Sequence, residues 1–220
     1  MEEVNFALLW SAQYEKIEQS LIINRRLLEE TINQKAQSAL QSLSRLKTIG
    51  IIASVIYLIF LGTLLSYAIA HYSSTVNYFI ISIAAIFFIH IKALSDYIKH
   101  LIWIDNIDYN DSIIEIQRKL VKLQLSIIQH TRFMFLQLPF WTTFYLSSKW
   151  FPGDVSWKYI LLQVFVTGVF AYLAYWLYKN ITIQNVNKKW VRMLIGGSGG
   201  KSIAKALAFY KEIEDFKLHE

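Results

Sequence analysis

The chain has 220 residues, of which 55% are hydrophobic and 15% aromatic, and its formal net charge is +6. A mean hydropathy of +0.34 is too high for a soluble domain of this size. The excess of apolar side chains is therefore expected to face lipid. The absence of cysteine excludes disulfides, thiolate metal sites and a cysteine nucleophile. Two prolines and eight glycines interrupt helices rarely, so the sequence predicts an all-α integral membrane protein.

Residues 1–48 show the periodicity of one long amphipathic helix. Apolar side chains recur at helical spacing from Trp10 to Leu46. At about 1.5 Å per residue, such a helix would extend roughly 60 Å from the bilayer, so its apolar stripe needs a partner. A strict heptad repeat would place Lys35 and Ser38 in the seam, which favours packing against other helices over an extended coiled coil. The residues expected to bind the partner are Trp10, Tyr14, Ile17, Leu21, Leu28 and Ile32.

Four apolar stretches follow, and each is a candidate to cross the bilayer as a helix. Residues 49–70 contain no ionisable side chain and match the roughly 20 residues that a crossing needs. Residues 76–94 include a lysine in their last turn, where its amine can reach the headgroups. The third stretch, 132–148, is shorter and contains a glutamine and a proline, whereas 159–178 carries only two polar interruptions. The sequence therefore predicts four transmembrane helices in two hairpins, residues 49–94 and 132–178.

Small residues in two of these spans predict close contacts between helices. They are Gly62, Ser66 and Ala70 in the first span and Gly168, Ala171 and Ala174 in the fourth. Gln137 and Gln163 form either a polar bridge between the third and fourth spans or the lining of a path for a solute. No acidic or basic residue lies deep in any span, which favours the bridge.

Lysine and arginine are distributed unevenly around the spans. Residues 1–48, 92–132 and 179–220 hold 20 of the 22, and the other two are Lys149 and Lys158. Because cytoplasmic flanks are enriched in basic residues, both termini are predicted to be cytoplasmic. The first residues lack a basic n-region, so no cleavable signal peptide is expected. We expect a multi-pass protein of a bacterial inner membrane.

Residues 95–131 form the second predicted cytoplasmic segment, which contains an acidic turn and a helix start. Three aspartates precede Ser112 and Glu115, whose spacing fits a capping box. The acidic turn also suggests calcium, but no register of it gives the spacing of an EF-hand. Helix capping is therefore the favoured interpretation.

The last segment, residues 179–220, contains the sequence GGKS. A phosphate-binding loop needs a glycine where this chain has Ile195, and a buried strand before it, which the preceding residues do not provide. No nucleotide is therefore expected, and no nucleic acid partner is expected either. Residues 196–200 are interpreted as a flexible glycine-rich linker, followed by an amphipathic helix that docks on the N-terminal helix or binds another molecule. The apolar face of that helix consists of Ile203, Ala206, Leu207, Tyr210, Ile213 and Phe216.

The ionisable residues show no pattern typical of a catalytic or metal site. The five histidines, among them His100 and His130, lack the spacing of metal ligands. Lys92, Asp96 and Lys99 follow one another at i, i+4 and i+7, which is typical of an ion-pair ladder on a solvated helix face. No pair of nucleophile and base is recognisable. We therefore expect no catalytic, metal or cofactor site and no enzymatic activity.

Five short stretches carry a similarity to a known group of proteins. They are Leu8-Leu-Trp10, Asn24-Arg-Arg-Leu-Leu-Glu-Glu30, Gln34-Lys-Ala-Gln-Ser-Ala-Leu40, Gly199-Gly-Lys-Ser-Ile-Ala-Lys-Ala-Leu207 and Lys211-Glu-Ile-Glu-Asp-Phe216. With them the whole chain resembles small bacterial inner-membrane proteins encoded beside extracytoplasmic-function sigma factors. No site residues are known for that group, so none is carried over. The resemblance implies a regulatory membrane protein, an anti-sigma-like tether.

These features predict a membrane-anchored regulatory or scaffold protein. Its amphipathic helices would bind a cytoplasmic protein partner or a second copy of the chain. The alternative is a small oligomeric channel, pore or transporter, which the absence of buried charge in the spans weakens. The identity of the partner, the stimulus, the oligomeric state and the passage of a solute stay open, as does full crossing by the third span.

Overall fold

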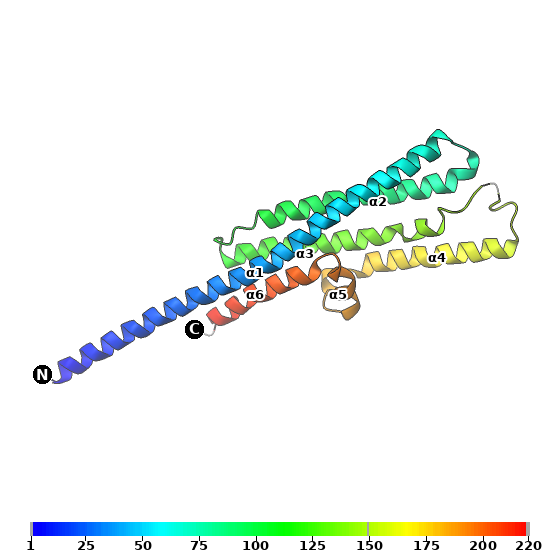
Figure 1. The fold of residues 1–220 in the computed structure, drawn as a ribbon. Helices are drawn as coiled ribbons and strands as arrows, with labels where there is room; N and C mark the ends of the chain where they lie inside the picture. The colour runs from blue at the N-terminus through cyan, green and yellow to red at the C-terminus, as the bar shows by residue number, and fades with distance from the viewer. Residues whose placement is uncertain (1, 149, 219–220) are drawn as a thin grey trace.

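The computed structural model describes residues 2–148 and 150–218, so Lys149 and His219, considered above from the sequence, lie outside the described residues. Over the described residues every regular element is a helix, as predicted, and the helices form one elongated bundle from which the first projects (Figure 1). In chain order the elements are α1 (Glu2–Ala70), η1 (Ser74–Val76), α2 (Asn77–Asp105), α3 (Ile113–Met134), η2 (Phe135–Thr142), α4 (Trp157–Asn180), η3 (Ile183–Asn185), α5 (Lys189–Gly196) and α6 (Gly200–Leu218).

The first helix, α1, joins the predicted cytoplasmic helix to the first predicted span without a break. It is 69 residues long, which at about 1.5 Å per residue gives roughly 100 Å. The helix contains no proline, and at Gly50 it packs closely against the ring of Tyr97. Only 3.0 Å separates Cε2 of Tyr97 from the position that a Cβ of residue 50 would take. The first two predicted segments are therefore one continuous helix.

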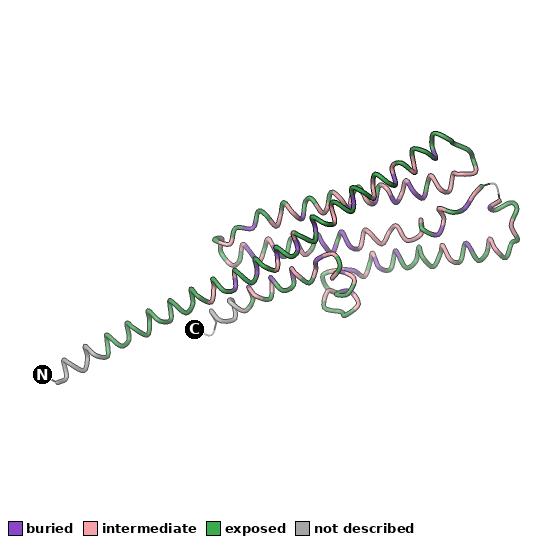
Figure 2. The backbone as a smooth tube through the Cα atoms, in the orientation of Figure 1, coloured by how far each residue is buried: buried purple, intermediate pink, exposed green. Residues whose placement is uncertain are grey.

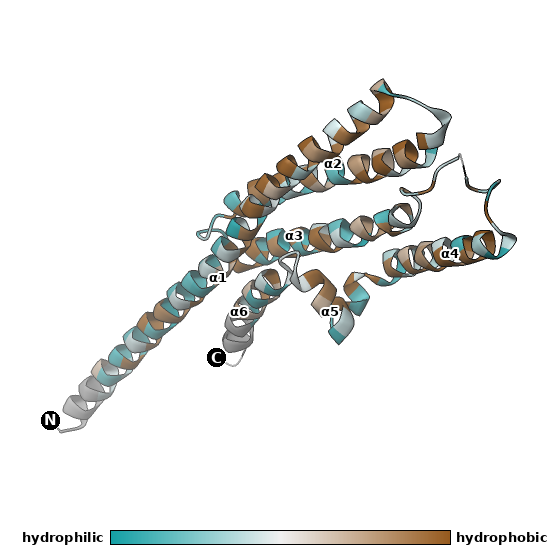
Figure 3. Ribbon diagram, turned by 45° about the vertical axis from the view of Figure 1, so that its right-hand side comes forward, coloured by the Kyte–Doolittle hydropathy of each residue, from teal (hydrophilic) through white to brown (hydrophobic). Residues whose placement is uncertain are grey.

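Three helices, α1, α2 and α4, are long and apolar enough to cross a membrane. Their apolar runs are residues 49–70, 76–94 and 159–178. These runs leave large apolar side chains exposed instead of burying them (Figures 2 and 3). Examples are Ile56, Phe88 and Phe165, which are each between 63% and 67% exposed. Helices with apolar side chains on their outer faces are expected in lipid, so the structure supports membrane association.

The third predicted span, residues 132–148, is not confirmed as a transmembrane helix. The α-helix α3 ends at Met134, and the chain continues as the 3-10 helix η2 and then as turns. Pro139 explains the change, because proline lacks an N–H and its ring clashes with the carbonyl four residues earlier in an α-helix. The hydroxyl of Thr142 donates to the carbonyl of Pro139 over 2.7 Å, close to the point where η2 ends. Since η2 still packs against α2 and α4, it occupies the place of the missing regular span.

The larger hydrophobic core is formed by α1, α3, α5, α6 and the end of α4, together with residues of the connections, and we call it the large core. On α1 its buried residues Ile32, Ala36, Leu40 and Leu43 share one stripe. Tyr210 of α6 is fully buried. Burial of each large apolar side chain contributes on the order of 1.5–3 kcal/mol. Thus α6 docks on the N-terminal helix, one of the two roles expected for it. The other buried members are Ile107, Ile116, Leu120, Leu123, Ile127, Ile128, Leu177, Ile181, Val191, Ile195, Ile203 and Ala206.

Candidate functional site

Five polar side chains meet just beyond the apolar runs, and we call them the polar cluster. Lys47 comes from α1, Asp96 and His100 from α2, and Ser126 and His130 from α3. Each pair on α2 and α3 is separated by one helical turn, so both members face the same side. Lys47 is 1% exposed and His100 fully buried, while Asp96, the most accessible, is 15% exposed. The cluster therefore lies inside the bundle, between three helices.

Hydrogen bonds connect the members of the polar cluster across helices. The carboxylate of Asp96 accepts from Nζ of Lys92 at 2.5 Å and lies 3.2 Å from Nδ1 of His130. Nε2 of His100 lies 2.9 Å from Oγ of Ser126. The amine of Lys47 donates to the carbonyl oxygen of Ser198, at 2.7 Å, in the turn between α5 and α6. These bonds tie α2 to α3 and, separately, α1 to that turn.

The polar cluster shifts the protonation of its own members. Burial alone would raise the pKa of Asp96, but hydrogen bonds from His130 and Lys92 outweigh it and lower the pKa to about 2. Burial and the charge of Lys47 lower the pKa of His100 to about 3. Burial also lowers the pKa of His130, against its hydrogen bond to Asp96. Burial lowers the pKa of Lys47 to about 8, opposed by the charge of Asp96. At neutral pH the cluster thus combines neutral histidines with a carboxylate and an ammonium.

The pair of Ser126 and His100 has the geometry of a nucleophile and a base, yet its surroundings do not suit catalysis. Ser126 is 7% exposed and His100 fully buried, so a substrate would not reach the hydroxyl. Nδ1 of His100 has no hydrogen-bond partner, whereas a catalytic base is normally oriented through its second nitrogen. Among the described residues, no three His, Asp or Glu side chains converge on a point that would hold a metal ion. The arrangement is suited to holding helices together.

Sequence reasoning missed this cluster because its members are distant in the chain. The interpretation of Asp96 as part of a solvated ladder was wrong: its pair with Lys92 exists, but its second partner, His130, belongs to another helix. Lys99 lies away from the pair and over the ring of Trp103, with 4.4 Å from Nζ to the ring centroid. One signal was available, since Lys47 continues the apolar stripe of the large core.

The glycine-rich residues 196–200 form a packed turn and differ from the flexible linker that composition suggested. Gly199 has a φ of +96°, which side chains rarely tolerate, and a Cβ there would collide with Leu43 of α1. A Cβ on Gly200 would collide with the side chain of Ile195. Ser198 accepts the bond from Lys47 in the same turn. Glycine is therefore required here because α1 approaches closely.

The six residues expected to bind a partner are divided between two environments. Trp10, Tyr14, Ile17 and Leu21 lie on the projecting part of α1 and are between 53% and 68% exposed. Leu28 is half-buried, and Ile32 is 2% exposed inside the large core. The apolar stripe is continuous in the sequence, but it is exposed up to residue 27 and packs into the large core from residue 28 on. Below we call residues 10–27 the projecting helix.

The small residues expected to pack spans together are divided in a similar way. Gly62 faces α2, where Cε2 of Phe87 would lie 3.6 Å from an added Cβ. Ala174 is 3% exposed. The remaining four are exposed in the described structure: Ser66, Ala70, Gly168 and Ala171. Close packing through small residues therefore holds only at two of the six positions within one chain.

Gln163 anchors a polar bridge between α4 and η2. Its amide donates to the carbonyl of Thr142 over 2.6 Å and to Oγ1 of Thr167 over 3.1 Å. The hydroxyl of Tyr145 donates to its Oε1 over 2.8 Å. Gln137 does not join this bridge, and its Oε1 is buried without a hydrogen-bond partner. The bridge between the two glutamines is thus not formed, although Gln163 links the same two segments.

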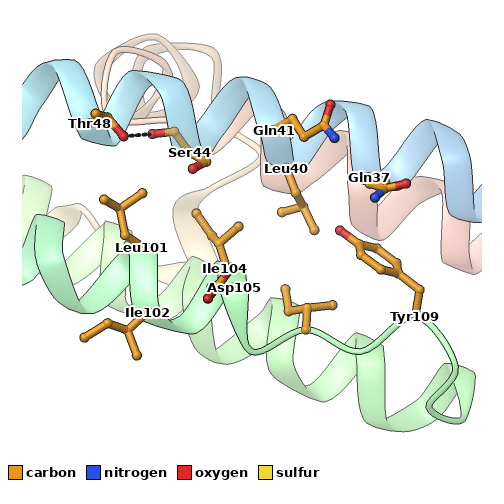
Figure 4. Close-up of a pocket in the computed structure, with 11 residues that line it drawn as sticks. Gln37, Leu40, Gln41, Ser44, Thr48, Leu101, Ile102, Ile104, Asp105 and Tyr109 are labelled. Carbon is orange, nitrogen blue, oxygen red and sulfur yellow. Dashed lines mark hydrogen bonds between the residues drawn. The ribbon is translucent and has the colours of Figure 1, made fainter.

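A pocket of about 480 Å³ lies between α1 and the end of α2 (Figure 4). Polar side chains of α1 line one wall, and Leu101 and Ile104 of α2 line the other. Tyr109, from the connection after α2, lies beside Gln37. The hydroxyl of Thr48 bonds to the backbone of its own helix, 3.0 Å from the carbonyl of Ser44. The pocket is open and carries no convergent charges.

Comparison with known proteins adds no relative from which a function could be transferred. No family model, curated protein or solved structure matches the chain.

Proposed function

We propose that the protein is a membrane-anchored scaffold that presents the projecting helix to a cytoplasmic protein partner. The observation that carries this proposal is the change of surroundings along α1. Its apolar run faces outward as expected in lipid, its middle is buried in the large core, and its first part stands free of the bundle (Figure 2). One rigid helix thus connects a membrane anchor to an exposed surface.

The projecting helix exposes seven large apolar side chains. Trp10, Tyr14, Ile17 and Leu21 alternate spacings of four and three residues, which places them on one face. Ile22, Ile23 and Leu27 add further exposed apolar side chains. Contiguous exposed apolar residues typically mark an interaction site. Burying each of them would contribute on the order of 1.5–3 kcal/mol, so a partner would gain substantial binding free energy.

The spacing favours a helix of another protein as the partner. When apolar residues alternate spacings of four and three along one face of a helix, the side chains of a second helix can pack into the gaps between them. The charge distribution supports a cytoplasmic position for this surface, because most of the basic residues lie at the same end of the spans. The resemblance noted above supports a regulatory partner, so that the protein would act as an anti-sigma-like tether.

Photo-crosslinking in cells tests this function with the full-length protein. A photoreactive residue at position 17 should give one adduct with another protein, whereas the same residue at position 32, inside the large core, should give none. Replacing Trp10 and Leu21 with Ser should abolish the adduct. The matched control replaces Ala12 and Gln19 with Ser, on the side of the same helix opposite this face, and should retain it. An adduct that survives the first replacement contradicts the proposal.

Two other outcomes have distinct meanings. The chain has a mass of 25.7 kDa. An adduct of twice that mass would show that the projecting helix binds a second copy of the chain and not another protein. Selective solute flux through liposomes that contain the purified protein would favour the channel alternative. No observation favours a channel at present, because the polar groups of Gln163 bond within the bundle and do not line a path.

A further inference from the structure

A pocket of about 410 Å³ lies at the junction of α3, α5 and α6 and is rich in cations. Arg192, which carries a guanidinium, lines it from α5, and Lys201 and Lys205, which carry amines, line it from α6. Gln124 and Asn187, which carry amides, also line it. These are the donors with which proteins bind phosphate. We propose that this pocket binds the phosphate group of an anionic phospholipid.

Among the described residues, no carboxylate neutralises the positive charge of the pocket. The sequence contains no aspartate or glutamate between Asp154 and Glu212. Among the described side chains, no ion pair involves the three cations. In the described part of the chain, the guanidinium of Arg192 donates to the backbone carbonyl of Asn187 over 3.0 Å. That bond orients Arg192 and leaves its charge available to an anion.

The shape of the pocket depends on the glycine turn. Gly196 has no side chain, and the stem of Lys201 occupies the space, with Cε 3.3 Å from where a Cβ would be. Gly200 is itself part of the pocket wall. Lys47 holds the turn by its bond to Ser198. The cations are thus placed on a fixed frame, although their side chains are exposed.

The position of the pocket favours a lipid as the source of the phosphate. Trp190 of α5 stacks on Trp176 in the last turns of α4, with 5.2 Å between the ring centroids. Tryptophan at the end of a transmembrane helix lies at the level of the headgroups. Met193, also on α5, is 81% exposed and offers an apolar contact next to Arg192. Basic pockets beside the cytoplasmic ends of spans bind anionic headgroups.

This inference goes beyond the scaffold function and does not rest on it. The test uses the full chain, stripped of lipid in a neutral detergent, and native mass spectrometry with phosphatidylglycerol or phosphatidylcholine. We expect phosphatidylglycerol to bind about tenfold more tightly. The variant Arg192→Gln/Lys201→Gln/Lys205→Gln should lose this preference. The control Lys16→Gln/Arg45→Gln/Lys211→Gln removes the same charge elsewhere and should keep it.

Further arms distinguish the source of the phosphate and guard against misfolding. If inorganic phosphate binds wild type but not the triple variant, while the two lipids bind equally, the ligand is a soluble phosphate and the lipid proposal is overturned. Equal preference for phosphatidylglycerol in wild type and triple variant also overturns it. Should the triple variant fail to fold, Lys205→Glu alone must lower the preference. The Ser variants of the projecting helix should keep it, so the two proposals fail separately.

Discussion

The amine of Lys47 and the carbonyl oxygen of Ser198 lie 2.7 Å apart, although 151 positions separate them in the chain. The bond fastens the turn between α5 and α6 to α1, just before the first apolar run. Lys47 is 1% exposed, so its ammonium depends on protein groups instead of water. The turn, in return, depends on the amine for the position of its carbonyl.

We expect Lys47→Met to loosen this turn without a large loss of stability. Methionine keeps the apolar stem, and removal of a buried charge offsets much of the lost hydrogen bond, so the free energy of unfolding should change by no more than about 1 kcal/mol. The carbonyl of Ser198 loses its donor. Hydrogen exchange over residues 196–200 should therefore become faster, while Arg45→Met, two residues away and exposed, should leave it unchanged. Unchanged exchange in Lys47→Met would show that the bond does not hold the turn.

The two glycines of the same turn should respond oppositely to alanine. At Gly199 the positive φ and the collision with Leu43 both oppose a Cβ, so Gly199→Ala should destabilise the protein by about 2–4 kcal/mol. Gly197 has a φ of −66° and open space around it. Gly197→Ala should therefore be neutral or stabilise by about 0.4–1 kcal/mol. Thermal unfolding in detergent measures both changes in stability. Equal changes for the two substitutions would support the interpretation of residues 196–200 as a flexible linker.

Acidification should destabilise the bundle through the polar cluster. The folded state lowers the pKa of His100 to about 3 and also lowers that of His130, so the unfolded chain takes up protons first. The contribution of these histidines to the free energy of unfolding is thus fully present above about pH 6.5, the pKa of histidine in the unfolded chain. Below that pH, the free energy of unfolding falls by at most about 1.4 kcal/mol per pH unit for each histidine. Asp96 and Lys47 change little between pH 7.5 and 5, because their folded pKa values are about 2 and about 8.

The measurement compares unfolding midpoints at pH 7.5 and pH 5. The double variant His100→Asn/His130→Asn should have a smaller difference between the two midpoints than wild type. If wild type shows no loss at pH 5, the two histidines are not held neutral in the fold.

The two glutamines near the end of the bundle form a matched pair. Gln163→Leu removes the partner of Thr142, Thr167 and Tyr145, and should destabilise the protein by about 1–2 kcal/mol. Gln137→Leu removes a carbonyl oxygen that is buried without a partner, so it should be neutral or slightly stabilising. Unfolding in the same detergent ranks the two variants. A larger loss for Gln137→Leu would mean that the polar bridge runs through the other glutamine.

Elements whose signal is local were predictable from the sequence. The stripe from Trp10 to Leu46 predicted helix, and Ser112 does cap α3, with its hydroxyl accepting from the amide of Glu115 over 3.4 Å. The all-helical class followed in the same way from periodicity and composition. Hydropathy alone overestimated the third span, because it ignored what Pro139 does to backbone hydrogen bonding.

The polar cluster was beyond local reasoning. Its members come from three helices, and nothing in the spacing of His100 or His130 shows that each finds its partner on another helix. The glycine turn was misread for the same reason. Composition equates glycine with flexibility, whereas Gly199 is needed because Leu43 of a distant helix fills the adjacent space.

The unbroken length of α1 gives the molecule a mechanical property. A force applied at Trp10 acts on a stiff rod whose pivot is the large core, and the other arm of that rod is the apolar run that begins at Ile49. The narrow contact between Gly50 and the ring of Tyr97 lies close to the pivot. A sideways displacement of the helix at Trp10 would therefore tilt the apolar run of α1 in the membrane. A force on the projecting helix would in this way disturb the lipids around that run.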